Sequence, residues 1–165
     1  MAPNATLALP TIVVGPTDLN RLHRELEALN DYIREAALRK AGEDSSKLPR
    51  TSRMLDEFMA LNKLNLLQAA DRDTVIAFLK QLHTTAPVLH ISFAVDPSAA
   101  FVDKIVLWLR QNIHPQVLLR VGLQPSIAAG CVVRTPNHQY DFSLRRRFTA
   151  NRPLLIKKLE SLTTP

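Results

Sequence analysis

The last third of the chain constrains the fold most, because strand-like apolar runs alternate there with turn residues. An apolar run over residues 116–122 is followed by Gln124-Pro125-Ser126, a sequence typical of a turn, and Gly130 then leads into a second apolar run. Pro136-Asn137 marks another turn before a short third strand around Tyr140. We predict Pro125, Ser126 and Gly130 to be structural turn residues, with Gly130 allowing close backbone approach.

The preceding segment predicts a strand followed by a helix. Residues 88–94 alternate like a strand, and Asp96-Pro97-Ser98 is typical of a helix start, with Asp96 as the cap. Apolar residues then recur every four positions from Phe101 to Ile113. From residue 88 onward the predicted order is strand, helix, strand, strand, helix, which favours a small sheet covered by helices on one face.

The N-terminal half is predicted to be mostly helical. Thr17 or Asp18 can cap a first helix, and apolar residues then follow with 3-4-3-4-3 spacing. The residues of this seam are Leu19, Leu22, Leu26, Leu29, Ile33 and Ala36. Such a seam either covers the protein's own core or contacts a helix of another subunit. Its first five residues are therefore candidate partner-binding residues.

The rest of the N-terminal half contains a loop and further helical patterns. Residues 7–14 are β-prone, and residues 42–50 are typical of an exposed loop. Thr51 or Ser52 starts a helical region, and Asp71 or Asp73 restarts it. The inward-facing residues are predicted to be Met54, Leu55, Phe58, Leu61, Leu64, Leu67, Val75, Phe78, Leu79 and Leu82. The predicted fold class is α+β, with a helical region over 1–83 and a small β-α-β-β-α domain over 84–165.

Composition indicates a folded, soluble chain that carries positive charge. Its 165 residues are 46% hydrophobic, which supports a core, and no apolar run approaches the roughly 20 residues of a membrane span. We expect the chain to be made without export. The single cysteine, Cys131, cannot form an internal disulfide and is expected to be a buried small apolar residue. The formal charge of +6 favours an acidic partner without identifying it.

The residue patterns of common active sites and metal sites do not occur in this sequence. No Gly-x-x-x-x-Gly-Lys loop is present, and the five histidines lack the spacing of metal ligands. His90 and Ser92 lie near Asp96, but alternation places the first two on one strand face while Asp96 is expected to cap the next helix. We therefore expect no cofactor, no metal, no small-molecule substrate and no enzymatic activity.

A run of three arginines, Arg145, Arg146 and Arg147, is the sharpest charge feature of the chain. It is supported by Arg134, Arg152, Lys157 and Lys158. The run is a solvated helix face, a docking site for an acidic partner helix, or a contact for a phosphate backbone. The spacing of Phe142 and Phe148 suggests burial beneath this helix, so exposed aromatic residues are not expected among the basic ones. A nucleic-acid-binding module is kept as the alternative function, and an enzyme of unknown type is a third class.

The same region resembles the C-terminal domain of the delta subunit of F-type ATP synthases, the oligomycin-sensitivity-conferring protein family. The family runs a strand into Asp-Pro-small-Ile/Leu-Gly-Gly, then a second strand, a turn, Asp-x-Ser and a helix rich in arginine and leucine. The matching residues are Pro125, Ser126, Ile127, Ala129, Gly130, Val132, Val133, Asp141, Ser143, Leu144 and Leu154. Gln124 stands where the family usually has Asp, and Ala129 replaces one Gly. The match covers roughly residues 88–159, and fewer residues precede it than the family's six-helix domain requires.

The resemblance implies a non-catalytic stalk subunit that takes part in ATP synthesis coupled to proton transport. Such a subunit joins the catalytic head to the peripheral stalk and holds the head still against rotor torque. The C-terminal domain is implied to bind the stalk b subunit, and the N-terminal region to receive the N-terminal helices of the alpha subunits. The implied location is the cytoplasmic face of the cell membrane, peripheral and within the complex.

Overall fold

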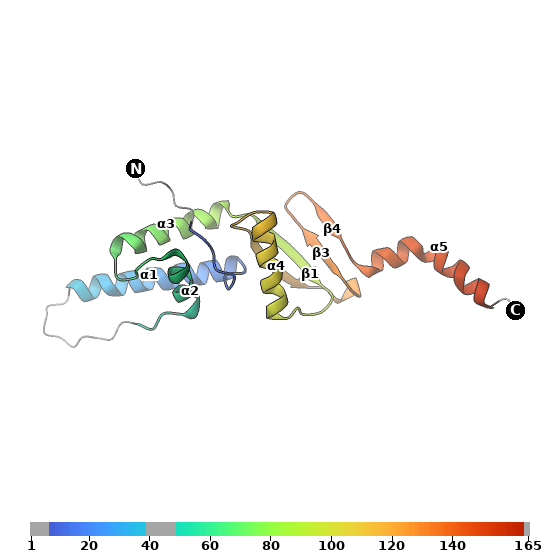
Figure 1. The fold of residues 1–165 in the computed structure, drawn as a ribbon, viewed down its shortest axis with the longest axis horizontal. Helices are drawn as coiled ribbons and strands as arrows, with labels where there is room; N and C mark the ends of the chain where they lie inside the picture. The colour runs from blue at the N-terminus through green and yellow to red at the C-terminus, as the bar shows by residue number, and fades with distance from the viewer. Residues whose placement is uncertain (1–6, 39–48, 164–165) are drawn as a thin grey trace. The chain divides into compact units, whose positions relative to one another are not determined.

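The computed structural model describes residues 7–38 and 49–163 and has an α+β fold, as the sequence predicts (Figure 1). Helices dominate the N-terminal half, and strands occur from residue 88 onward. In chain order the elements are α1 (Pro16–Leu38), α2 (Arg53–Asn62), α3 (Ala69–Thr85), β1 (Val88–Phe93), α4 (Ala99–Asn112), β2 (Leu118–Leu123), the 3-10 turn η1 (Pro125–Ile127), β3 (Cys131–Arg134), β4 (Gln139–Asp141) and α5 (Leu144–Thr163). No helix among these described residues is long and apolar enough to cross a bilayer.

The chain divides into two compact units. The first contains the described residues of 7–88 together with 102–118, and the second contains residues 89–101 and 119–163. This division differs from the predicted boundary after residue 83, because residues 102–118 belong with the N-terminal helices. The hydrophobic core of the first unit contains buried residues from both of its chain segments.

The apolar seam of α1 lies in the core of the first unit. Leu19, Leu22 and Leu26 are at most 1% exposed, Leu29 is also buried, and Ile33 is partly buried against the same cluster. Burial of a large aliphatic side chain contributes about 1.5 to 3 kcal/mol, so these residues hold α1 to its own unit. The prediction of a partner surface at these five residues is therefore corrected in favour of the intramolecular alternative. Ala36, the last residue of the predicted seam, is exposed.

The segment before α1 is a turn and not the strand that its β-prone sequence suggests. Leu9 and Val13 are buried in the core. The guanidinium of Arg110 donates hydrogen bonds to three backbone carbonyls of this segment, those of Leu9 (3.1 Å), Pro10 (2.8 Å) and Val13. A strand would need a neighbouring strand to pair with these carbonyls, whereas here one partly buried side chain donates hydrogen bonds to them.

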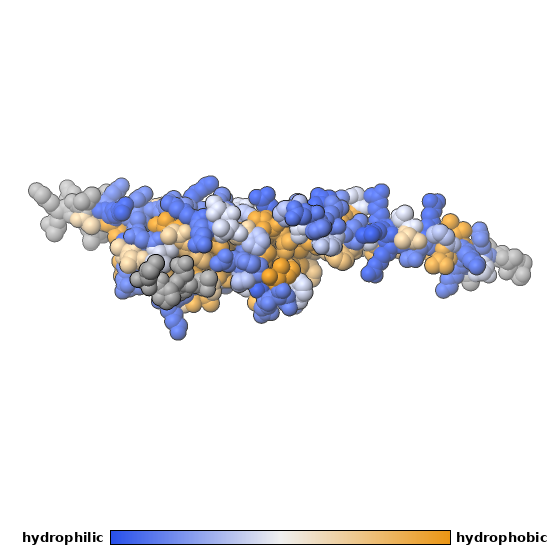
Figure 2. Space-filling view, turned by 90° about the horizontal axis from the view of Figure 1, so that it is seen from above, coloured by the Kyte–Doolittle hydropathy of each residue, from blue (hydrophilic) through white to orange (hydrophobic). Residues whose placement is uncertain are grey.

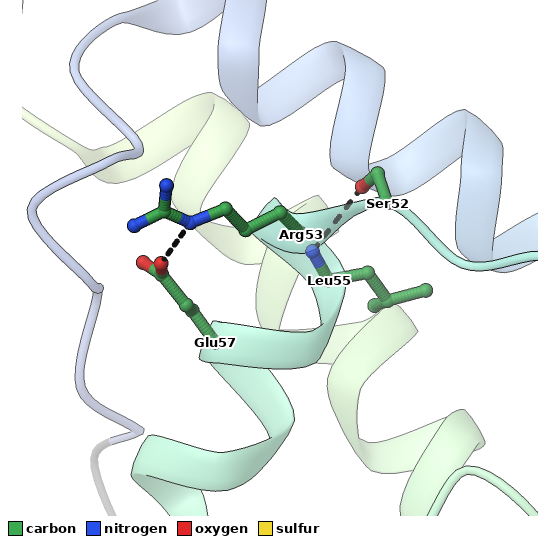
Figure 3. A network of polar contacts seen from close by, with 4 residues as sticks. All are labelled: Ser52, Arg53, Leu55 and Glu57. Atoms are coloured by element: carbon green, nitrogen blue, oxygen red, sulfur yellow. Dashed lines mark hydrogen bonds and ion pairs between the residues drawn. The ribbon is translucent and has the colours of Figure 1, made fainter.

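Helix α2 begins as the sequence predicts, with Ser52 at its N-cap. The Ser52 hydroxyl accepts a hydrogen bond from the Leu55 amide at 3.3 Å and donates one to Glu25 of α1 at 2.6 Å. Figure 3 shows the Ser52 hydroxyl directed at the Leu55 amide, beside an ion pair of 2.7 Å between Arg53 and Glu57. The cap therefore both starts α2 and ties it to α1.

Helix α2 is shorter than the sequence pattern suggests. Helix α2 ends at Asn62 because Lys63 adopts a left-handed conformation (φ 54°) and its amide bonds back to Ala60 and Met59. Leu61 and Leu67 are predicted to face inward, but both are exposed: Leu61 lies on the outer face of α2, and Leu67 lies beyond its end. Of the predicted loop over 42–50, residues 42–48 lie outside the described part of the chain.

The second unit is built on a four-stranded sheet in the order β2-β1-β3-β4. Strands β1 and β2 run parallel, since the amides of Leu118 and Gln124 bond to the carbonyls of Pro87 and Phe93 at the same offset of 31 residues (118 − 87 and 124 − 93). Strands β3 and β4 continue the sheet as antiparallel neighbours. The sheet therefore has one strand more than the predicted β-α-β-β-α order, and this short strand is the one expected around Tyr140.

Helix α4 differs from its predicted start and face. It begins at Ala99, with Ser98 just before it, so Asp96 is not its cap. Val106 and Leu109 are buried, whereas Phe101 (49%) and Ile113 (57%) are exposed. A spacing of four residues drifts around a helix of 3.6 residues per turn, so a run of such positions does not stay on one buried face.

Candidate partner-binding site on helix α5

A strained turn precedes the strands that support α5. Pro125 and Ser126 lie in η1. Ala128, the residue that follows η1, has φ 66° and ψ −54°. The Ala129 amide donates to the Ile127 carbonyl at 2.9 Å, which closes a γ-turn centred on Ala128. This γ-turn conformation is rare and strained for an alanine, at a cost of about 1 to 3 kcal/mol, so the turn is held in place by its surroundings.

Gly130 occupies the predicted point of close backbone approach. Its φ is +92°, and a Cβ added there would lie 2.4 Å from the carbonyl oxygen of Phe142. The amide of Phe142 bonds to the carbonyl of Cys131 at 2.9 Å. The residues just before α5 are thus packed against a position where only glycine fits without rearrangement.

Asp141 and Ser143 start α5, as the Asp-x-Ser pattern predicts. The Ser143 hydroxyl accepts from the Arg146 amide at 3.3 Å, which is an N-cap, and the Ser143 amide donates to the Asp141 carboxylate at 2.8 Å. Hydrogen bonding by the Ser143 side chain and amide, with smaller contributions from Arg146 and Arg145, lowers the pKa of Asp141. The carboxylate is therefore held in its charged form beside the first turn of α5.

Every described side chain of α5, from Leu144 to Ser161, is exposed. The helix nevertheless carries an apolar groove along one side, with Phe148 61% and Leu155 50% exposed. The groove is lined by Leu144, Arg147, Phe148, Asn151, Leu154, Leu155 and Lys158. Figure 2 shows hydrophobic surface next to hydrophilic surface on this helix. Most helical stability in proteins comes from packing of an apolar face, so an exposed apolar groove on α5 points to a partner.

Positive charge is concentrated on the same helix. Residues 144–163 contain six Lys or Arg and one Glu, a formal charge of +5 (6 − 1), against +6 for the whole chain. Arg145, Arg146 and Arg147 are all exposed, as are Arg152, Lys157 and Lys158. Of the predicted arginine run, Arg147 lines the apolar groove, whereas Arg146 lies on the opposite side of the helix. Sequence reasoning singled out the arginines but missed the groove, although Leu144, Phe148, Asn151 and Leu155 follow a 4-3-4 spacing that indicates it.

The aromatic residues near α5 contradict the sequence prediction of burial. Phe142 is 59% exposed and Phe148 is 61% exposed. Tyr140 and Phe142 are stacked, with ring centroids 6.5 Å apart and an interplanar angle of 15°. The prediction of burial is wrong for both phenylalanines because no described element of the second unit covers their rings. Exposed aromatic residues therefore do accompany the basic ones.

The remaining sequence candidates lie elsewhere. His90 and Ser92 share one sheet face, since they lie two residues apart on β1, and Ser92 is buried. Cys131 is partly buried, and this burial raises the pKa of its thiol. Within residues 7–38 and 49–163 no group of three or more His, Cys, Asp or Glu is placed to hold a metal ion.

Comparison with models of known protein families finds no match to this chain, and comparison with curated proteins finds no similar sequence.

Proposed function

We propose that the protein is a non-catalytic stalk subunit of a rotary F-type ATP synthase. The observation that carries the proposal is α5, a capped helix whose apolar groove and arginines are exposed together. A subunit that only connects two bodies needs docking surfaces and no reaction centre. The Pro125 turn, Gly130 and the Asp141-x-Ser143 cap, which carry the resemblance to the delta-subunit family, are also the features that position α5.

In this proposal the two units have separate tasks. The second unit binds the stalk b subunit through α5, because an apolar groove flanked by arginines suits an acidic amphipathic helix. The first unit, with α1, α2 and α3, receives the N-terminal helices of the alpha subunits. The protein would then be peripheral at the cytoplasmic face of the cell membrane through the complex, and it would need no cofactor.

The test is affinity capture of the full-length protein from detergent-solubilised membranes of the cells that encode it, with every captured subunit identified by mass spectrometry. We expect the alpha, beta and b subunits to be enriched. If these subunits are present in the extract but absent from the capture, the proposed function is wrong.

A second candidate function, a basic nucleic-acid-binding module, is favoured by one specific observation. The stacked rings of Tyr140 and Phe142 are exposed close in sequence to Arg145, and aromatic rings beside cations bind single-stranded nucleic acid. This candidate requires tight binding of oligonucleotides with a steep salt dependence. We expect only weak binding at physiological salt, and tight binding together with failed stalk capture would make this the preferred function.

A further inference from the structure

The groove of α5 follows the geometry of a coiled-coil seam. Its central residues are Leu144, Phe148, Asn151, Leu155 and Lys158, which recur with 4-3-4-3 spacing. This spacing keeps one stripe of side chains facing a partner helix over several turns. All five side chains are exposed, so the stripe is open in this chain.

The positions that flank the seam are basic. In heptad terms Phe148 and Leu155 are a positions, so Arg147 is a g position and Arg152 an e position. Residues at e and g contact the corresponding positions of a paired helix and set the choice of partner. In a parallel pair of two α5 helices, Arg147 of one copy would lie beside Arg152 of the other, and like charges there are unfavourable.

The polar residues of the seam point to a defined partner. Asn151 and Lys158 occupy d positions, where a buried polar or charged group is stable only opposite a polar or acidic group. A uniformly apolar helix or a helix with basic flanks leaves them without partners. An acidic helix with a polar group at the matching seam positions satisfies both residues.

The position of Pro153 agrees with a partner on the seam side. At 100° per residue it lies on the opposite side of α5 from Phe148 and Leu155. Proline removes a backbone hydrogen bond and clashes with the preceding turn, which opens the helix on the proline side and makes the other side concave. The seam is therefore on the side that curves toward a partner.

We propose that α5 forms a two-helix coiled coil with an acidic amphipathic helix of another protein, and that Arg147 and Arg152 prevent it from pairing with a second copy of this chain. The inference rests on the proposed function for the use of α5 as the docking site, but not on the identity of the complex.

The experiment measures binding of the full-length protein to a designed helical peptide with leucines at the seam, asparagine and glutamate at the positions facing Asn151 and Lys158, and glutamates at the flanks. A second peptide differs only in having lysines at the flanks. The test variant is Arg147→Glu with Arg152→Glu. The matched control is Arg146→Glu with Lys157→Glu, which makes the same charge change on the opposite side of α5.

We expect the acidic peptide to bind the wild type and the control variant within about twofold of each other, and the test variant at least about tenfold more weakly. The lysine-flanked peptide should not bind, and the wild type should sediment as a monomer at the concentrations used. Equal weakening by both variants, binding of the lysine-flanked peptide, or self-association through α5 would overturn the proposal. So would binding to vesicles with anionic lipids in preference to the acidic peptide.

The outcomes separate this inference from the proposed function. Peptide binding with the expected variant pattern but no capture of ATP synthase subunits supports the coiled coil and contradicts the stalk function. Capture of the subunits by the wild type and the test variant alike supports the stalk function and contradicts the coiled coil.

Discussion

The backbone amide of Leu144 donates a hydrogen bond of 2.9 Å to the carbonyl of Ala129, so the first residue of α5 is attached to the turn that precedes β3. Gly130 follows that carbonyl directly and lies against Phe142, two residues before Leu144. The turn and the helix start therefore form one structural element. Changes in the turn should alter partner binding through α5 as well as stability.

Replacement of Gly130 by valine should destabilise the protein strongly. The φ of +92° and a Cβ within 2.4 Å of the Phe142 carbonyl require the backbone to move, and we expect a loss of at least about 3 kcal/mol in the free energy of unfolding. Urea denaturation measures the loss. Gly122→Ala is the control, because its Cβ would meet the ends of the His90 and Ser92 side chains, at 2.8 Å and 3.3 Å, and no backbone atom as close, and it should cost about 1 kcal/mol. Equal losses for the two variants would contradict the described turn.

Replacement of Ala128 by glycine should stabilise the protein. Glycine relieves the strained γ-turn conformation at φ 66°, and this gain of about 1 to 3 kcal/mol exceeds the entropic cost of glycine in the unfolded chain, which is about 0.4 to 1 kcal/mol. The neighbouring variant Ala129→Gly has only the entropic cost and should lower the melting temperature. A lower melting temperature for Ala128→Gly would show that the γ-turn is not formed.

Arg110 should be essential to the N-terminal segment. Its guanidinium spans three carbonyls, and burial lowers its pKa to about 10, so it stays charged at neutral pH. Arg110→Met should cost about 2 to 3 kcal/mol in denaturation experiments, since charged hydrogen bonds are lost and the carbonyls lose their donor. Arg110→Lys should recover little of this, because an ammonium group lacks the planar fork. Lys104→Met, an exposed change on the same helix, should be nearly neutral.

The helix cap at Ser143 should make α5 sensitive to acid. The lowered pKa of Asp141 means that its stabilising contribution is present above the ordinary pKa of about 3.9 and is lost as the pH falls through the lower folded pKa. Helicity followed by circular dichroism should therefore decrease more in the wild type than in Asp141→Asn over that range. Ser143→Ala should cost about 1 kcal/mol at neutral pH. Identical acid profiles for the wild type and Asp141→Asn would contradict this role.

The local elements of the second unit were predictable because their signals are short-range. Turn residues such as Pro125 and Gly130 and the cap at Ser143 determine structure through their own backbone and neighbours. The segment before α1 was not predictable in this way. Its β-prone sequence forms a turn because Arg110, about 100 residues away, donates the hydrogen bonds to its carbonyls that a neighbouring strand would otherwise donate.

The candidate site was likewise predictable from the sequence only in part. The arginine run was visible as charge, whereas the exposure of Phe142 and Phe148 depends on which elements pack over them. Two apolar stripes with similar spacing differ in burial. The seam of α1, at Leu19 and Leu22, is buried against its own unit, and that of α5, at Phe148 and Leu155, is open. Periodicity identifies an apolar stripe but does not say which chain covers it.

Binding of the purified b subunit from the same cells tests the central claim most directly. Titration of its soluble portion into the full-length protein should show saturable one-to-one binding to the wild type and to Arg146→Glu with Lys157→Glu, and at least about tenfold weaker binding to Arg147→Glu with Arg152→Glu. Melting curves of the three proteins should agree closely, since exposed charges contribute about 0 to 1 kcal/mol each to stability. Absence of b-subunit binding to the folded wild type, together with tight and salt-sensitive binding of oligonucleotides, would contradict the account.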